Sequence, residues 1–208
     1  MKLYQSPLSS NSRKTSITAK LLRSPVELVH VDLMKREHLS PEFLTLNPNA
    51  AVPVLVDGAF VLTESNAIMI YLCEIAGDAG EDLHPPALKP RSQVDRWLFW
   101  MSSHWGPTIA ALNFEHNLKK LLKQGEADSA HVLRSDGMFK KFASVLDAEL
   151  GRREFVAGDS LSIADIAIAA PLMYASAAKL PIESYKNIGT WFERITALPA
   201  WKETEPSF

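Results

Sequence analysis

The chain contains very little cysteine: Cys73 is the single one among 208 residues. One cysteine excludes an intrachain disulfide, a Cys-x-x-Cys redox pair and a zinc site built on cysteines. The six histidines are scattered and do not have metal-ligand spacing, so we expect no metal cofactor.

Long hydrophobic runs are missing as well, since no apolar stretch approaches the roughly 18 to 20 residues of a membrane span. The first residues lack the basic-then-apolar order of a signal peptide, so we expect a cytoplasmic protein with no membrane partner. Neither sign of charge dominates, because 22 Lys and Arg face 24 Asp and Glu, for a formal net charge of −2. This balance argues against nucleic acid as a partner.

What is present is the composition of an ordinary folded protein, with 47% hydrophobic and 22% charged residues. Residues 1–5 predict a short strand and residues 13–22 a helix. Residues 26–33 predict a half-buried strand, because its apolar positions alternate as far as Val31. This order predicts a βαβ unit with a parallel strand pair.

A hairpin and a further helix complete the first half. After a short helix predicted over 41–46, two β-rich runs flank Asp57-Gly58, which is a strong signal for a tight turn. A helix is predicted to begin near Thr63, with an apolar face made of Ala67, Ile68, Tyr71, Leu72 and Ile75.

The remainder of the chain has helical patterns. A long helix is predicted to run to about Lys123, with a stripe made of Val94, Trp97, Leu98, Met101 and Trp105. A second helix is predicted over 128–151, with inward positions Met138, Phe142, Val145, Leu146 and Leu150. Ser162 and Asp165 predict a capping box at the start of a third helix, which Pro171 should bend or shorten.

Three segments follow from these patterns. Residues 1–77 form a predicted α/β domain and residues 90–208 a predicted all-helical domain. Between them, residues 78–89 shift in composition to Gly, Asp, Glu and Pro, which is typical of a linker.

The order of the elements and the spacing of several motifs resemble the glutathione transferases, of a bacterial serine-type or related cytosolic class. Val52-Pro53 stands directly before the hairpin and Glu64-Ser65 directly after it, as in the glutathione-binding half of that family. Residues 155–165 are similar to the start of the family's buried core helix, and residues 191–201 to its last helix. The resemblance covers nearly the whole chain. It implies a thioredoxin-like α/β N-terminal domain followed by an all-α C-terminal helical domain.

The same motifs suit the chemistry of glutathione, which would serve as co-substrate. A cis bond before Pro53 would turn the backbone of Val52 outward, so that it can pair with the cysteinyl unit. Glu64 and Ser65 stand at a helix N-terminus, where backbone N–H groups favour a carboxylate, while Glu64 can pair with an ammonium group. Glutathione carries both groups at its γ-glutamyl end.

The glycine carboxylate of glutathione often meets a basic or amide side chain in this family. The turn before Val52 offers Asn49 as its amide candidate. From the preceding loop, Lys35, Arg36 or His38 can also reach this position. Asn66 occupies the position where some classes carry Arg.

The thiol of glutathione needs a hydrogen-bond donor at its sulfur, because a free thiol with a pKa of about 8.5 is mostly protonated at neutral pH. The loop before the first helix supplies three candidates, Ser9, Ser10 and Asn11. The serine-type classes place the activating hydroxyl just after the proline, which implies Ser9. The cysteine-type bacterial class has Cys where this chain has Ser10, and some bacterial members use an Asn of this loop. At least one of the three is expected to be the helix N-cap.

The resemblance places the electrophile pocket between this loop and the helical hairpin, lined by Leu8, Trp100, Ser103, His104 and Trp105. The implied activity is conjugation of glutathione to small hydrophobic electrophiles, and the implied assembly is a homodimer. Two alternatives remain. One is glutathione-dependent isomerisation, dehalogenation, or peroxide or disulfide reduction on the same fold; the other is a non-catalytic binding or regulatory relative.

Overall fold

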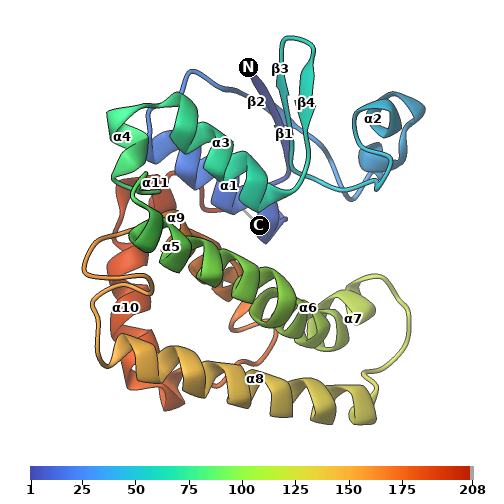
Figure 1. Ribbon diagram of the computed structural model, residues 1–208. Coiled ribbons are helices and arrows are strands. Elements are labelled where there is room, and N and C mark those ends of the chain that lie inside the picture. The colour runs from blue at the N-terminus through green and yellow to red at the C-terminus, as the bar shows by residue number, and fades with distance from the viewer. Residues whose placement is uncertain (207–208) are drawn as a thin grey trace. The chain divides into compact units, whose positions relative to one another are not determined.

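The computed structural model describes residues 1–206, which form two compact units. The first unit comprises residues 1–86 together with the segment from residue 197 onward, and the second comprises residues 87–196 (Figure 1). The predicted helical domain extended to the last residue, whereas the structure groups residues 197–206 with the first unit.

The first unit is built on a four-stranded sheet in the order β2-β1-β3-β4. Its strands are β1 (Lys2–Gln5), β2 (Glu27–His30), β3 (Val54–Asp57) and β4 (Phe60–Leu62). β1 pairs with β2 in parallel, and β3 pairs antiparallel with both β1 and β4. The predicted parallel pair and the hairpin at Asp57-Gly58 are confirmed, and Gly58 takes the positive φ of +59° that the tight turn requires.

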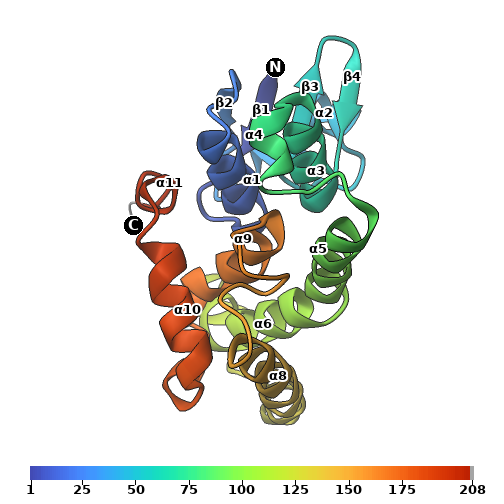
Figure 2. The same ribbon diagram turned by 60° about the vertical axis from the view of Figure 1, so that its left-hand side comes forward.

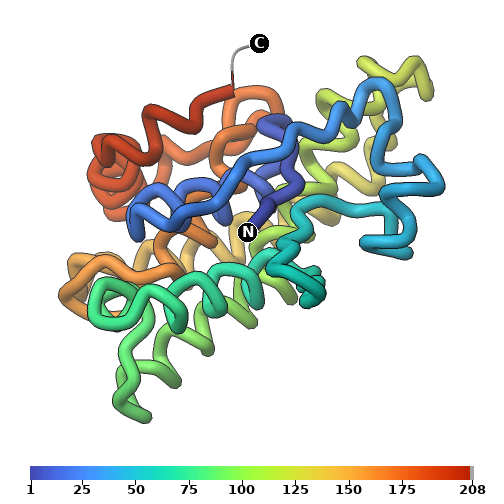
Figure 3. The backbone as a smooth tube through the Cα atoms, turned by 90° about the horizontal axis from the view of Figure 1, so that it is seen from above, coloured from blue at the N-terminus to red at the C-terminus, as the bar shows by residue number. Residues whose placement is uncertain are grey.

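Helices pack on this sheet. The helices of the unit's first 86 residues are α1 (Ser10–Leu21), η1 (Glu37–Leu39), α2 (Pro41–Leu46), α3 (Ser65–Ile75) and α4 (Asp78–Glu81). α1 and α3 lie side by side and contact β1 and β3 (Figures 1 and 2). Tyr4 and Val54 are register partners, and with Phe43 of α2 they form a separate apolar cluster. In Figure 3, the segment that carries η1 and α2, in lighter blue, loops out from the rest of the first unit.

α1 begins at Ser10, three residues before the predicted start. Most of its buried residues are polar, although Ile17 and Ala19 are buried as well. Its buried polar residues are Ser12, Arg13, Lys14, Thr15, Ser16 and Thr18. The hydroxyl of Thr15 donates to the backbone oxygen of Ser12 at 2.7 Å. The guanidinium of Arg13 donates to the backbone oxygen of Trp201 at 3.2 Å and lies 4.2 Å from the Trp201 ring centroid. Trp201 belongs to α11 (Pro199–Lys202), so the end of the chain supplies a partner for α1.

The predicted linker begins with ordered structure. α4 follows Gly77, and Gly80 packs so closely on the backbone of Cys73 that an added Cβ would overlap the Cys73 carbonyl oxygen. The helix of the second unit starts at Leu88, two residues before the predicted domain begins.

The second unit is all-helical within the part of the chain that the structure describes. Its elements are α5 (Leu88–Trp100), η2 (Met101–Trp105), α6 (Gly106–Asn113), η3 (Phe114–Leu118), α7 (Lys119–Leu121), α8 (Ser129–Leu150), α9 (Ile163–Ala169), η4 (Ala170–Tyr174), η5 (Ile182–Ser184) and α10 (Lys186–Thr196). The predicted long helix is confirmed as a helical run from Leu88 to Leu121, in which η2 and η3 are π-helical turns. All residues of α9 are buried, and at Ala170 the helix gives way to the 3-10 turn η4, as Pro171 predicted.

The inward face of α8 differs from the prediction. Met138 and Val145 were expected inside, but they are 40% and 48% exposed. The buried positions are Phe139, Phe142, Ala143, Leu146 and Leu150. The stripe is rotated toward Phe139 because its rigid ring stacks on Trp105, at 5.2 Å between ring centroids.

The predicted last helix over 191–201 is two helices. α10 ends at Thr196, and α11 begins at Pro199, which occupies the first helical position. Proline suits that position because its missing N–H would have no partner there.

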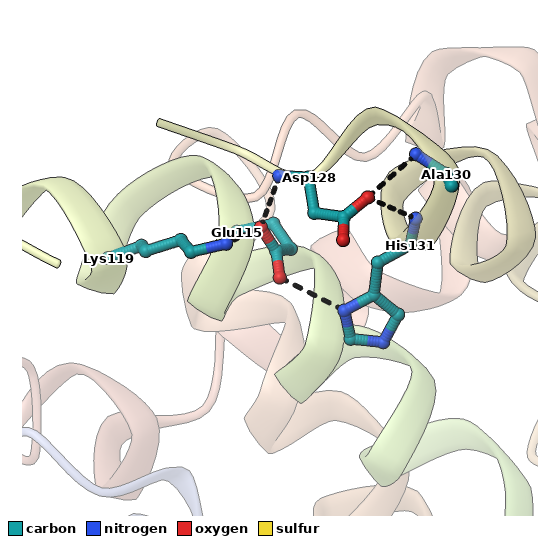
Figure 4. Close-up of polar contacts among 5 residues, drawn as sticks. All are labelled: Glu115, Lys119, Asp128, Ala130 and His131. Carbon is teal, nitrogen blue, oxygen red and sulfur yellow. Dashed lines mark hydrogen bonds and ion pairs between the residues drawn. The ribbon is translucent and has the colours of Figure 1, made fainter. Parts of the chain in front are cut away.

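A buried carboxylate joins η3 to the start of α8 (Figure 4). Glu115 accepts hydrogen bonds from Lys119 at 2.9 Å, from the backbone N–H of Asp128 at 2.8 Å, and is 3.0 Å from the His131 ring. Asp128 in turn caps α8 by accepting from the backbone N–H groups of Ala130 and His131. The Asp128 N–H bond lowers the pKa of Glu115 to about 2, with the bonds from Lys119 and His131 acting in the same direction.

Candidate active site

The loop between β1 and α1 ends in a capped helix start. The N–H of Ser9 donates to the backbone oxygen of Ser6 at 3.0 Å, which turns the chain after Pro7. The Ser9 hydroxyl accepts from the N–H of Ser12 at 3.3 Å, so Ser9 is the N-cap of α1. The expectation that one of the three loop candidates caps the helix is confirmed. An accepting hydroxyl still carries its own proton, so capping does not occupy Ser9 as a donor.

A second helix N-terminus lies beside the first. Glu64 precedes α3 with φ 66° and ψ 110°, a sparsely populated conformation for a residue other than glycine, and its side chain is exposed. Ser65, the first residue of α3, is 8% exposed and donates from its hydroxyl to the side-chain oxygen of Asn11 at 3.3 Å. This bond joins the first turns of α1 and α3, so the structure brings Asn11 and Ser65 together. Ser10, half-buried, occupies the first helical position of α1 beside them.

Lys14 of α1 contacts the first turn of α3, and the sequence patterns did not single it out. Its side chain is 1% exposed, and its ammonium is 2.6 Å from the side-chain oxygen of Asn66. Burial lowers the pKa of Lys14 to about 7, although the nearby Glu64 carboxylate acts in the opposite direction. Lys14 lies three residues after Asn11 on α1, so the two share one helix face.

The Val52-Pro53 peptide bond is cis, as expected. Val52 is 9% exposed and belongs to the apolar cluster of Phe43 and Val54. It precedes the paired part of β3, whose register with β1 starts at Val54.

The candidates for the glycine carboxylate have different surroundings. The exposed Lys35 lies 3.4 Å from the Asp32 carboxylate. The N–H of Asn49 donates to the side chain of Asn47 at 3.1 Å, and its own side chain is exposed. The Nδ1 atom of His38 is buried and has no hydrogen-bond partner among residues 1–206.

The pocket candidates fall in both units. Leu8, in the first unit, is half-buried. In the second unit, Trp105 is 0% exposed and donates from its indole N–H to the backbone oxygen of Ile168 at 3.0 Å. Trp105 stacks on the half-buried Trp100 at 5.8 Å between centroids, so it supports Trp100 from the interior. Ser103 and His104 are exposed and, like Trp105, belong to the π-helical turn η2.

The capping box of α9 is a structural anchor inside the second unit. The buried Asp165 carboxylate accepts from the N–H groups of Val156 and Ser162, both at 2.9 Å, and from the Trp191 indole at 3.0 Å. The Ser162 hydroxyl also donates to it at 2.8 Å. Burial raises the pKa of Asp165, while these hydrogen bonds oppose the shift.

Within residues 1–206, no group of three or more His, Cys, Asp or Glu side chains is placed to hold a metal ion. No helix in this range combines the length and the apolar character needed to cross a membrane.

Comparison with known proteins assigns both units. Residues 3–81 match the family model described as glutathione S-transferase, N-terminal domain, and residues 97–199 match glutathione S-transferase, C-terminal domain. Glutathione S-transferase F10 of Arabidopsis thaliana is 31% identical over 97% of this chain and 95% of its own length. Glutathione S-transferase 3 of Zea mays is 34% identical over 98% of this chain and 92% of its own.

Among solved structures, a glutathione transferase family member from Pseudomonas fluorescens, crystallised with two glutathione molecules bound, superposes with a TM-score of 0.89. It is 25% identical, and the match covers 98% of this chain and 91% of that one. The chain therefore belongs to the glutathione S-transferase family.

Proposed function

We propose that the chain is a glutathione transferase that joins the sulfur of glutathione to small hydrophobic electrophiles. The observation that carries the proposal is the pair of adjoining helix N-termini, linked by the Ser65 to Asn11 hydrogen bond, with the Ser9 hydroxyl at the cap of one of them. The N-terminus of each helix carries a partial positive charge, which favours an anion there.

The γ-glutamyl end of glutathione binds at the start of α3. Its carboxylate accepts from the backbone N–H and hydroxyl of Ser65, and its ammonium group pairs with the exposed Glu64 carboxylate. The unusual backbone conformation of Glu64 supports this assignment, because such conformations cluster at ligand sites.

The rest of the tripeptide extends along the edge of the first unit. The backbone of Val52 pairs with the cysteinyl unit, next to Pro53. For the glycine carboxylate, His38 is the strongest candidate because its buried Nδ1 lacks a partner among residues 1–206, whereas Lys35 already pairs with Asp32. Asn49 remains an alternative donor.

Ser9 activates the thiol by donating a hydrogen bond from its hydroxyl to the sulfur, which stabilises the thiolate more than the thiol. The thiol proton passes to solvent. The thiolate electron pair then forms a carbon–sulfur bond with the electrophile, and the leaving group departs with the electron pair of the bond that breaks. Ser10 and Asn11 are the alternative donors.

Leu8 in the first unit and Trp100, Ser103 and His104 in the second are the proposed electrophile contacts. Trp105 is proposed to act indirectly, since it is enclosed by its own unit and stacks behind Trp100.

A thermal-shift titration with glutathione tests the binding step, followed by chloro-nitroaromatic, isothiocyanate, hydroperoxide and maleyl-acid substrates to separate conjugation from peroxidase and isomerase activity. We expect a saturable rise of the melting temperature and conjugation of the chloro-nitroaromatic. Binding without turnover of any of these substrates would favour a non-catalytic relative, and absence of binding would reject the site.

We also propose a homodimer. Apolar side chains of the first unit are exposed at Phe60 (48%), Val61 (41%) and Ile75 (46%), and the second unit exposes Leu88 and Phe99 on α5. An isologous interface would bury these side chains. Sedimentation at micromolar concentration should give twice the monomer mass, and Phe60→Glu should lower it to that of a monomer, with Leu133→Glu, an exposed position on α8, as the control.

The proposed location is the cytoplasm, where the glutathione pool keeps thiols such as Cys73 reduced. Subcellular fractionation tests this location, and recovery in a membrane or secreted fraction would contradict it.

A further inference from the structure

Lys14 is buried where a lysine is costly. Its side chain is 1% exposed, while Lys20, two turns later on the same helix, is 35% exposed and pairs with Glu203 at 2.8 Å. An ammonium group removed from water must be compensated by partners or lose its proton. The fold therefore keeps Lys14 in the interior for a reason that apolar packing does not supply.

The partners of Lys14 belong to the glutathione site. Asn11 and Lys14 are three residues apart on α1 and share one face. They face two consecutive residues of the first turn of α3: Asn11 accepts from Ser65, and Lys14 donates to Asn66 at 2.6 Å. Two parallel side-chain bonds thus set the position of the α3 N-terminus against α1.

The carboxylate of Glu64, which stands directly before that first turn, favours the protonated form of Lys14. The other elements packed on α1 are β1 and α11. The titratable groups on the three elements are Lys2 and Tyr4 on β1, Tyr71, Cys73 and Glu74 on α3, and Lys202 on α11. On α1 itself, Arg13 is engaged with Trp201. Glu64 is the group whose charge acts on Lys14.

We propose that Lys14 is a positioning residue of the glutathione site, which takes up a proton when the γ-glutamyl carboxylate binds and then holds Asn66 and the first turn of α3 in place as a charged ammonium group. This inference rests on the proposed function, because it assumes that the carboxylate binds at Ser65.

Linkage between protonation and binding explains why Lys14 takes up a proton when the carboxylate binds. In the free protein Lys14 has a pKa of about 7, so it is partly neutral at slightly alkaline pH. A carboxylate bound at the start of α3 adds a negative charge nearby, which raises the pKa of Lys14 and draws a proton from solvent. By reciprocity, protonated Lys14 strengthens binding of the carboxylate. If the increase is about one pKa unit, binding at pH 7.5 takes up roughly half a proton.

The experiment is isothermal titration calorimetry with S-methylglutathione, in phosphate and in Tris at pH 7.5. The methyl group blocks the thiol, so its ionisation does not contribute to the protons that move on binding. The difference in heat between two buffers of unlike ionisation enthalpy gives the number of protons. The variants are Lys14→Met, which is neutral, Lys14→Arg, which stays charged, and Lys20→Met as the matched control on the same helix.

We expect the parent protein and Lys20→Met to take up roughly half a proton, and Lys14→Met and Lys14→Arg to take up almost none. Lys14→Met should also bind about tenfold more weakly than Lys14→Arg, a difference of about 1.4 kcal/mol. Equal proton uptake in Lys14→Met and the parent, or none in a parent that binds, overturns the inference. If Lys14→Met does not fold, the proton uptake of the parent is compared with that of Lys14→Arg, and equal uptake in the two overturns the inference. A parent that binds neither S-methylglutathione nor glutathione rejects the proposed function instead.

Discussion

Replacing Ser9 by alanine distinguishes two roles of its hydroxyl, the cap of α1 and the proposed activation of the glutathione thiol. In the structure its oxygen accepts from the N–H of Ser12 at 3.3 Å and caps α1. In the proposed function its proton points to the sulfur of glutathione. Ser9→Ala removes both interactions, but their consequences appear in different measurements, because one concerns folding and the other the ionisation of a bound ligand.

The cost of each loss can be worked out. An N-cap is worth about 1 kcal/mol, and 3.3 Å is long for this bond, so the melting temperature should fall by only about 2 to 4 °C. A hydrogen bond to a charged group is worth about 1.5 to 3 kcal/mol, and one pKa unit corresponds to about 1.36 kcal/mol. The pKa of the bound thiol should therefore rise by about 1 to 2 units, and the conjugation rate at neutral pH should fall about 10- to 100-fold.

The assay is the pH dependence of kcat/KM with a chloro-nitroaromatic substrate, together with ultraviolet titration of the bound thiolate. The inflection in both should move upward in Ser9→Ala, since the unassisted thiol ionises at higher pH. The rates of variant and parent should approach each other as pH rises. Glutathione binding through Glu64, Ser65 and Val52 should change little.

Ser40 provides the matched control. It caps α2 by the same type of bond, since its hydroxyl accepts from the N–H of Phe43 at 3.2 Å. Ser40→Ala should lower stability by a similar amount and leave the pH profile unchanged. Ser9→Thr should keep both functions, because threonine retains the hydroxyl.

The reasoning is refuted if Ser9→Ala keeps the parental profile. Should Asn11→Ala shift the inflection instead, Asn11 is the donor. Its side-chain oxygen already accepts from Ser65, so the amide N–H₂ group would then be the one directed at the sulfur. Ser10→Ala is compared in the same assay, because Ser10 is the other alternative donor.

Three other changes test separate parts of the structure. Glu64→Ala should weaken glutathione binding by about ten- to a hundredfold in calorimetry, since a charge-assisted contact is worth about 1.5 to 3 kcal/mol, and unchanged affinity after replacing both Glu64 and Ser65 would reject the site. Glu115→Gln should lower the urea midpoint at pH 7, with Glu126→Gln, an exposed residue of the same unit, as control. In the parent, the pKa of Glu115 is about 2, below its ordinary value of 4.5. The ionised carboxylate therefore contributes fully to the free energy of unfolding above pH 4.5, and this contribution is lost as the pH falls toward 2. A urea midpoint equal in parent and Glu115→Gln at both pH 7 and pH 2 would contradict this. Gly80→Ala should cost roughly 3 kcal/mol, because the new Cβ would overlap the carbonyl oxygen of Cys73, and a chemical denaturation curve matching the parent would contradict that packing.

Local signals predicted the elements that depend on local chemistry. Asp57-Gly58 specified a turn, Ser162 and Asp165 specified a helix start, and both are where the sequence placed them. The rotation of α8 depends on which ring stacks on Trp105, a contact between residues 34 positions apart, and periodicity cannot choose between Met138 and Phe139.

In the candidate site, too, some residues could be predicted from local patterns and one could not. Ser9, Glu64 and Ser65 stand at helix starts, which the sequence marks by polar residues before apolar runs. Lys14 could not be found in this way, because lysine within a helix predicts a solvent-exposed face. Its burial depends on Asn66, 52 residues away, and the short range of sequence patterns does not contain that contact.

The contact between Arg13 and Trp201 has a consequence for the order in which the protein is made. A ribosome releases the chain from its N-terminus, and domains generally fold as they emerge. The first unit, however, draws the partner of Arg13 from a residue 188 positions later, through the Trp201 backbone oxygen and ring. Its α1 helix therefore cannot complete its packing until Trp201 has been synthesised, which is after the whole of segment 87–196, the second unit, has been made.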